Sequence, residues 1–194
     1  MASTGTGSGG AEFFGVKASG RRFVFIVDSS KSMNGGKFED ACEELFYAVQ
    51  RLSSEQFFYV IFFDQNAARM TFAPNQQPEE SFARATPTNI NKLQAWMKTV
   101  ELELQTNPYD AVVFAQGLVP DAIYILTDGK FTDKGKTEKF LKNNNLFSDP
   151  VEGESVKAVI HTVGFYDPDG EETLKRIAKD HKGTYRFVPR PRKT

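Results

Sequence analysis

Residues 23–33 read FVFIVDSSKSM, in which five apolar residues are followed at once by an aspartate and by hydroxyl side chains. The apolar run is rich in β-branched and aromatic residues and has no polar alternation, which is typical of a strand covered on both faces. Comparable runs lie at residues 57–63, 122–126 and 156–163, and a last strand is expected at residues 184–188. Together these runs predict the strands of one central sheet.

Amphipathic helical patterns separate the predicted strands. Apolar residues recur at the helical period in residues 37–52 and 90–102, and shorter helices are expected at residues 110–116, 137–143 and 171–181. This alternation favours an α/β fold, a doubly wound, Rossmann-like three-layer sandwich around a mostly parallel sheet. Ligands bind beyond the carboxyl ends of the strands in such sheets. The residues that follow each strand are therefore the candidates for function.

Composition excludes several classes of function. The 194 residues include 24 Lys and Arg against 25 Asp and Glu, so the chain has no excess of positive charge and nucleic acid is not an expected partner. A single cysteine, Cys42, rules out an internal disulfide framework and a zinc site of several thiolates. No apolar run approaches the roughly 20 residues of a membrane span, so none is expected in this chain. Carboxylates and hydroxyls must carry any chemistry.

The sequence predicts one folded domain, at residues 13–188. Residues 1–12 are mostly Gly, Ser, Thr and Ala, and they are predicted to form a flexible linker or a vector-derived remnant. Residues 189–194, PRPRKT, are predicted to form a basic, proline-rich tail. We expect the domain to be monomeric on its own.

Five oxygen-bearing side chains are predicted to meet at one edge of the sheet. Asp28, Ser30 and Ser32 follow the first strand at a spacing of two, Asp128 follows a later strand, and Thr106 lies between them in sequence. Oxygen ligands suit Mg²⁺ or Mn²⁺, and Ca²⁺ is a further option. Two carboxylates would balance the charge of the ion, and weakly binding hydroxyls would leave it electrophilic. An open coordination position on the ion would then attract a carboxylate from another molecule.

Three short motifs carry a family resemblance. D-x-S-x-S at residues 28–32, T-N-x-Y-D-A at residues 106–111 and T-D-G at residues 127–129 occur in this order on the predicted elements. This pattern resembles that of von Willebrand factor A domains, in which it is called the metal-ion-dependent adhesion site. The resemblance extends over nearly all of the folded body and suggests a bacterial member. It implies a doubly wound sheet with one antiparallel edge strand.

The resemblance also implies a role for each of the five residues. Ser30 and Ser32 match direct metal ligands, and Thr106 matches a direct ligand of the ligand-bound state. Asp28 and Asp128 match carboxylates that largely contact the metal through a water molecule or stand behind its direct ligands. The resemblance thus implies Mg²⁺ or Mn²⁺ as the cofactor.

Two positions depart from the family pattern. Lys31 stands between the serines, where family members often have glycine, and its ammonium either weakens metal binding or helps to hold an acidic partner. Leu104 and Gln105 stand before Thr106, where the family often has two glycines. Because Gln105 restricts backbone angles that glycine permits, the Thr106 loop is expected to sit differently.

We therefore expect a divalent-cation-dependent protein-binding module and not an enzyme. Its partner would supply an Asp or Glu carboxylate to the metal. Lys31, Lys130 and Phe131 would form the partner-binding rim, two lysines for attraction and one apolar anchor. An alternative is a scaffold subunit of a larger complex, such as a partner of a ring ATPase.

A metal-dependent phosphohydrolase with Asp28 as nucleophile is a less favoured alternative. Phosphatases of the haloacid dehalogenase type carry a second aspartate two residues after the first, as general acid. Ser30 takes that position in this chain and cannot act as an acid near neutral pH.

Overall fold

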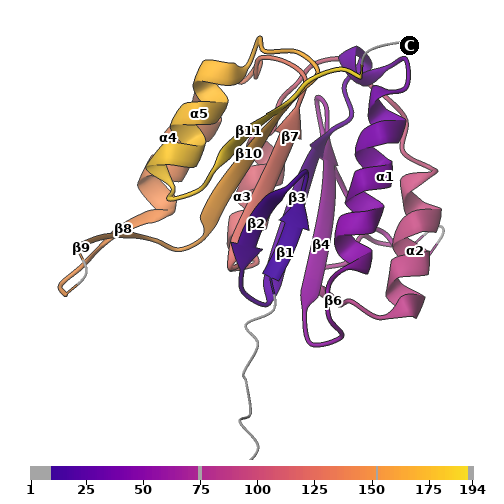
Figure 1. Cartoon of the computed structure of the whole chain (residues 1–194), viewed down its shortest axis with the longest axis horizontal. Helices are drawn as coiled ribbons and strands as arrows, with labels where there is room; N and C mark the ends of the chain where they lie inside the picture. Colours follow the sequence, from indigo (N-terminus) through magenta and orange to yellow (C-terminus); the bar gives the residue numbers. More distant parts are fainter. Residues whose placement is uncertain (1–9, 74–75, 152, 192–194) are drawn as a thin grey trace, which may run out of the picture.

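A mixed sheet organises the computed structural model, which describes residues 10–73, 76–151 and 153–191 (Figure 1). The described strands of this sheet are β3 (Arg22–Asp28), β4 (Phe57–Phe63), β5 (Ala67–Arg69), β6 (Ala83–Arg84), β7 (Ala122–Thr127), β10 (Val159–Phe165) and β11 (Tyr185–Val188). Their order is β11-β10-β7-β3-β4-β5, and β6 also pairs with β4. The strands β3, β4, β7, β10 and β11 run parallel, whereas β5 and β6 are antiparallel to β4. The predicted α/β fold, with a mostly parallel sheet and an antiparallel edge strand, is confirmed.

Helices and a hairpin cover the two faces of the sheet (Figure 1). The helices are α1 (Lys37–Gln50), α2 (Pro87–Met97), α3 (Tyr109–Gly117), α4 (Lys136–Asn144) and α5 (Glu171–Asp180). Phe62 of β4 packs against Phe38 of α1 and Trp96 of α2, with ring centroids 5.2 and 5.3 Å apart. Tyr59 points to the opposite face, where it packs against Phe114 of α3 at 5.2 Å. Helices α1 and α3 therefore lie on opposite faces.

The hairpin of β1 (Gly10–Phe13) and β2 (Val16–Ser19) lies on the same face as α1 (Figure 1). Ala11 and Phe13 are buried, and the hydroxyl of Tyr124 donates to the carbonyl oxygens of Ala11 and Val16, 3.1 Å from each. Residues 10–12, which the sequence places in the linker, thus belong to this hairpin. The rest of the predicted linker, residues 1–9, lies outside the described residues, as do residues 192–194 of the predicted tail.

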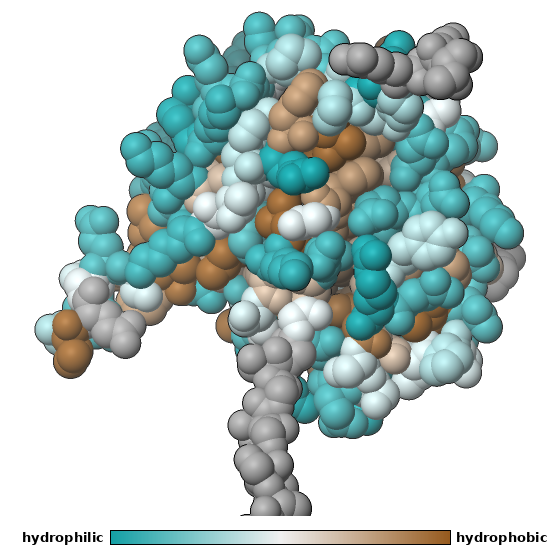
Figure 2. All heavy atoms as spheres, viewed as in Figure 1, coloured by the Kyte–Doolittle hydropathy of each residue, from teal (hydrophilic) through white to brown (hydrophobic). Residues whose placement is uncertain are grey.

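The strand expected at residues 156–163 begins later, at Val159. Val156 belongs instead to β9 (Gly153–Val156), which pairs with β8 (Leu146–Asp149) in a separate antiparallel hairpin. At this break the side chain of Asn145 accepts the N–H of Ala158 and donates to its carbonyl, each at 2.9 Å. This hairpin projects from the body, and Val151 near its tip is 93% exposed. Figure 2 shows apolar atoms at its far end.

The core places the carboxyl end of β3 at the centre of one edge. Residues 23–27 of β3 are fully buried between β4 and β7, and each large apolar side chain contributes about 1.5–3 kcal/mol on burial. Helix α1, which follows β3, and helix α4, which follows β7 and packs on α3, leave this edge toward opposite faces. Such a reversal creates the crevice in which doubly wound sheets bind ligands. Among the described residues, no helix is long and apolar enough to cross a bilayer.

Candidate functional site

Asp28 is the last residue of β3 and is fully buried at the carboxyl edge of the sheet. One carboxylate oxygen accepts the N–H of Ser30 at 2.8 Å, and the other accepts the hydroxyl of Thr127 at 2.5 Å. Burial raises the pKa of Asp28 to about 6; these hydrogen bonds oppose the rise, and the nearby charge of Asp128 adds to it. The Asp28 carboxylate therefore stands where an added cation would be stabilising.

Ser30, Ser32 and Asp128 form a chain of hydrogen-bonded oxygens beside Asp28. The hydroxyls of Ser30 and Ser32 are 2.8 Å apart, and Ser32 donates to Asp128 at 2.6 Å. The short 3-10 turn Lys31–Met33 sets this spacing, because Met33 is fully buried and its N–H bonds the carbonyl of Ser30. Ser30 and Asp128 are buried, whereas Ser32 is exposed. The structure thus brings four of the five predicted residues together, in a cluster that opens to solvent at Ser32.

Thr106 lies at the same edge but is held differently. Glu103 forms a parallel bridge with Ser30, and the N–H of Thr132 bonds the carbonyl of Thr106 at 2.8 Å. The Thr106 segment is therefore placed between the loops that follow β3 and β7. Thr106 is largely buried, and within the described part of the chain its hydroxyl has no hydrogen-bond partner, although this oxygen is not among the fully buried polar atoms that lack one.

Gln105 adopts the backbone conformation that the sequence suggested it would resist. Its φ is +75°, in the left-handed region that glycine enters freely and that costs other residues about 1–2 kcal/mol. Other contacts in the loop must offset this strain. The substitution of glycine by glutamine thus leaves a strained residue directly before Thr106.

Lys37, the first residue of α1, is a site residue that the sequence did not reveal. Its ammonium donates to Asp128 in an ion pair, with the Lys37 side chain only 13% exposed and that of Asp128 1%. Gly35 and Gly36 precede it with φ of +76° and +93°, a tight turn that returns the chain to the edge. The sequence signal that could have revealed Lys37 is the Gly-Gly pair directly before it, which indicates a turn at the edge where Asp128 is expected.

Asp64 is a second residue that sequence reasoning missed. It directly follows β4 and is buried, and its carboxylate accepts the Ser29 hydroxyl at 3.3 Å and the N–H of Asn66 at 2.8 Å. Its backbone carbonyl accepts the N–H of Asn107 at 2.7 Å. Asp64 thus ties the β3 loop to the Thr106 segment, and its place at a strand end was the signal that could have revealed it.

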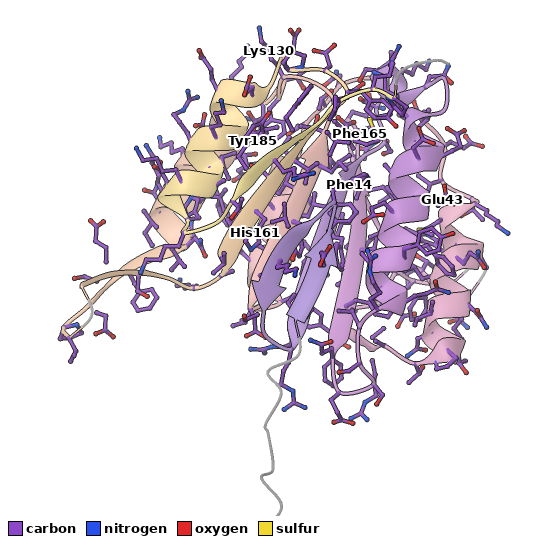
Figure 3. All side chains as sticks on the ribbon, viewed as in Figure 1. Phe14, Glu43, Lys130, His161, Phe165 and Tyr185 are labelled. Atoms are coloured by element: carbon purple, nitrogen blue, oxygen red, sulfur yellow. The ribbon has the colours of Figure 1, made fainter. Side chains whose placement is uncertain are left out.

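The predicted rim residues surround this edge unequally. Lys31 and Lys130 are exposed, and Figure 3 shows Lys130 at the upper edge of the molecule. Phe131 is half-buried and packs edge-on against Phe63, with ring centroids 6.3 Å apart. The two lysines are therefore free to attract an anion, whereas Phe131 offers a reduced apolar surface.

The donor set fits a hard divalent cation. Among residues 10–73, 76–151 and 153–191, no three His, Cys, Asp or Glu side chains are grouped to hold a metal. A cation at this edge would accordingly rely on hydroxyls together with the carboxylates of Asp28 and Asp128. Such all-oxygen sets suit Mg²⁺ and Mn²⁺. The ammonium that contacts Asp128 demonstrates that the cluster accommodates positive charge.

Comparison with known proteins identifies the family. The family model of the von Willebrand factor type A domain matches residues 21–187. The chain belongs to this family. Von Willebrand factor A domains typically act as protein-interaction modules, and their homologues are generally non-enzymatic.

The chain is also similar to individual proteins. The uncharacterized protein sll0103 of Synechocystis sp. is 28% identical over 167 residues, which cover 86% of this chain and 37% of that protein. The chain thus spans little more than a third of this curated relative. A von Willebrand factor type A structure from Catenulispora acidiphila has a TM-score of 0.72 at 18% identity and covers 91% of this chain and 40% of that one.

One structural neighbour contains a metal. Proximal thread matrix protein 1 of the mussel byssus, solved with zinc in its metal-ion-dependent adhesion site, has a TM-score of 0.60 and 15% identity; the match covers 92% of this chain and 42% of that chain. At such identities the two solved structures establish a shared fold.

Proposed function

We propose that this domain is a divalent-cation-dependent protein-binding module. Asp28, Ser30, Ser32 and Asp128 would hold Mg²⁺ or Mn²⁺, and Thr106 would join them when a partner is bound. The observation that carries the proposal is the hydrogen-bonded oxygen cluster at the carboxyl edge of β3 and β7. Because four of these side chains are already close together, little reorganisation is needed to surround a cation.

The exposure of the cluster supports a ligand from outside the chain. Ser32 faces solvent, and the exposed lysines Lys31 and Lys130 border the same edge. A cation held by two carboxylates and neutral hydroxyls keeps affinity for a further anion, and the lysines would steer an acidic partner toward it. An Asp or Glu side chain of a protein partner is the ligand that suits both features.

The surroundings of Asp28 argue against the phosphohydrolase alternative. Both oxygens of this carboxylate accept hydrogen bonds from Ser30 and Thr127, and the side chain is fully buried. An attacking nucleophile must reach its substrate, which a fully buried carboxylate does not do. Asp28 is thus better suited to hold the site together than to attack phosphorus.

Calorimetric titration of the metal-stripped protein with Mg²⁺ and Mn²⁺ tests the metal site. The parent should bind one ion saturably, and the double variant Asp28→Ala, Ser30→Ala should lose more than about 100-fold in affinity. A matched control is Asp180→Ala, Ser155→Ala, which removes the same groups far from this edge. Circular dichroism verifies that each variant is folded. Absence of binding by the folded parent at millimolar metal would refute the proposal.

A model ligand tests the partner chemistry separately. In amide NMR spectra, N-acetyl-glutamate methylamide should shift residues near Ser32 and Lys130 when Mg²⁺ is present but not when it is chelated. The matched control is N-acetyl-glutamine methylamide, which has the same size without the charge. Equal shifts with both compounds, or shifts that are independent of Mg²⁺, would argue against carboxylate recognition through the metal.

A further inference from the structure

The ammonium of Lys37 pairs with a carboxylate oxygen of Asp128, one of the residues of the proposed metal site. Asp128 has two carboxylate oxygens, of which one accepts the Ser32 hydroxyl and the other pairs with Lys37. Both side chains of this ion pair are largely withdrawn from solvent. The pair therefore differs from the exposed ion pairs of the chain, such as Lys175 with Glu171, which contribute little.

Local structure makes this contact specific to Lys37. The left-handed Gly35 and Gly36 end the β3 loop and start α1 at Lys37, which sets its side chain beside Asp128. A Cβ at either glycine would meet no atom within 4 Å, so the two glycines serve the turn and not close packing. Lys31 and Lys130 border the same edge, but within the described residues neither forms an ion pair.

Electrostatics gives the contact a function in the absence of metal. Asp28 and Asp128 are both buried and their charges oppose each other. A buried carboxylate without a counter-charge is costly, and the tethered ammonium of Lys37 supplies that charge to Asp128. A divalent ion held by this cluster would supply the same compensation to Asp128. The two cations therefore compete for one carboxylate.

We propose that Lys37 is a built-in competitor of the metal, so that the Lys37–Asp128 ion pair and metal occupancy exclude each other. This inference rests on the metal site proposed above and adds a residue that sets its affinity. Lys37 stabilises the metal-free domain and raises the cation concentration needed to fill the site. On metal binding its ammonium moves from Asp128 toward the rim, where it adds to the positive charge of Lys31 and Lys130.

The test compares Mg²⁺ binding by metal-stripped Lys37→Met with the parent in calorimetry. The variant should bind about tenfold more tightly, because its Asp128 is no longer occupied. Lys136→Met removes the same charge from the exposed start of α4, outside the rim and without a contact to Asp128, and should change affinity less than about threefold. Lys37→Arg keeps the cation and should stay near the parent.

Thermal unfolding gives a second readout. Metal-stripped Lys37→Met should melt below the parent, since Asp128 loses its counter-charge, and saturating Mg²⁺ should raise its midpoint more than it raises that of the parent. If the variant is too unstable to titrate, Lys37→Gln, which also removes the charge but keeps a polar side chain, takes its place with the same expected directions.

Each outcome decides one of the two proposals. Tighter binding by Lys37→Met, together with a parent-like Lys136→Met, supports competition. Equal or weaker binding by Lys37→Met, when the parent binds, overturns the role of Lys37 and leaves the metal site intact. Failure of the parent and of every variant to bind Mg²⁺ overturns the metal site itself, and with it the competition.

Discussion

Two groups of residues meet at the carboxyl edge of the sheet, and they are held there in different ways. The ends of β3 and β7 are joined by side-chain hydrogen bonds, from Ser32 to Asp128 and from Thr127 to Asp28. The Thr106 segment is held through its backbone, and its hydroxyl has no partner in the described part of the chain. The first group is thus assembled in advance, whereas the second retains freedom to adjust.

This difference has a physical origin. Strands β3 and β7 are adjacent and parallel, and apart from Arg22 all their residues are buried, so the sheet fixes the residues at their carboxyl ends. Thr106 follows the strained Gln105 in a loop before α3. We infer that the β3 and β7 loops determine metal affinity, and that Thr106 contributes chiefly when a partner is bound.

The largest effect is expected from the double variant Ser30→Ala, Ser32→Ala. It removes both hydroxyls of the preassembled group, and Mg²⁺ affinity in calorimetry should fall more than about 100-fold. Ser53→Ala, Ser54→Ala, in the loop that precedes β4, is the matched control and should bind like the parent. A loss below tenfold would show that the serines are not central to the site.

A smaller effect is expected from Gly170→Ala, which touches no proposed ligand. A Cβ at Gly170 would lie 2.4 Å from the carbonyl oxygen of Gly129, so the loop that carries Asp128 must shift. The free energy of unfolding should fall by about 2 kcal/mol, and Mg²⁺ affinity by about tenfold. Gly117→Ala is the control, since its Cβ meets no atom within 4 Å. Unchanged affinity in Gly170→Ala would contradict a rigid Asp128 loop.

In the absence of a partner, Thr106→Ala should weaken Mg²⁺ binding only about threefold, because the Thr106 segment is the one that retains freedom to adjust. Thr106→Ser keeps the hydroxyl and should match the parent. The same calorimetric titration measures all three proteins. A loss of Mg²⁺ affinity as large as that of the double serine variant would show that Thr106 is assembled in advance like the β3 and β7 residues, and would contradict the difference between the two groups.

The smallest effect is expected from Gln105→Gly. Glycine relieves the left-handed strain at φ +75°, and thermal unfolding should show a gain of about 0.5–1 kcal/mol in the free energy of unfolding. Gln105→Ala keeps the strain and removes the rest of the side chain, so it should show no gain. Equal stability of the glycine and alanine variants would indicate that Gln105 is not strained.

Much of the architecture could be predicted because it depends on local pattern. The run FVFIV must be covered on both faces, and the oxygen side chains that follow it at Asp28 and Ser30 must then lie at an edge of the sheet. The hairpin of β1 and β2 gave no comparable signal. Its four-residue strands lie among Gly and Ser, and they are stabilised by distant contacts such as that of Tyr124 with Ala11.

The remaining site features depend on contacts between distant residues. Lys37 and Asp128 are 91 residues apart, and they are brought together by the pairing of β3 with β7 and by the turn at Gly35 and Gly36. The conformation of Gln105 likewise follows from its loop and not from its own preference. Sequence pattern located the oxygen cluster, but the charge that compensates it required the fold.

The most direct measurement is a crystal structure of the metal-stripped protein soaked in Mn²⁺, with anomalous differences recorded to locate the ion. We predict one anomalous peak within coordination distance of the Ser30 and Ser32 hydroxyls, with the Lys37 ammonium withdrawn from Asp128. A peak elsewhere on the molecule, or none at millimolar Mn²⁺ in crystals with this edge open to solvent, would contradict the assignment of the site.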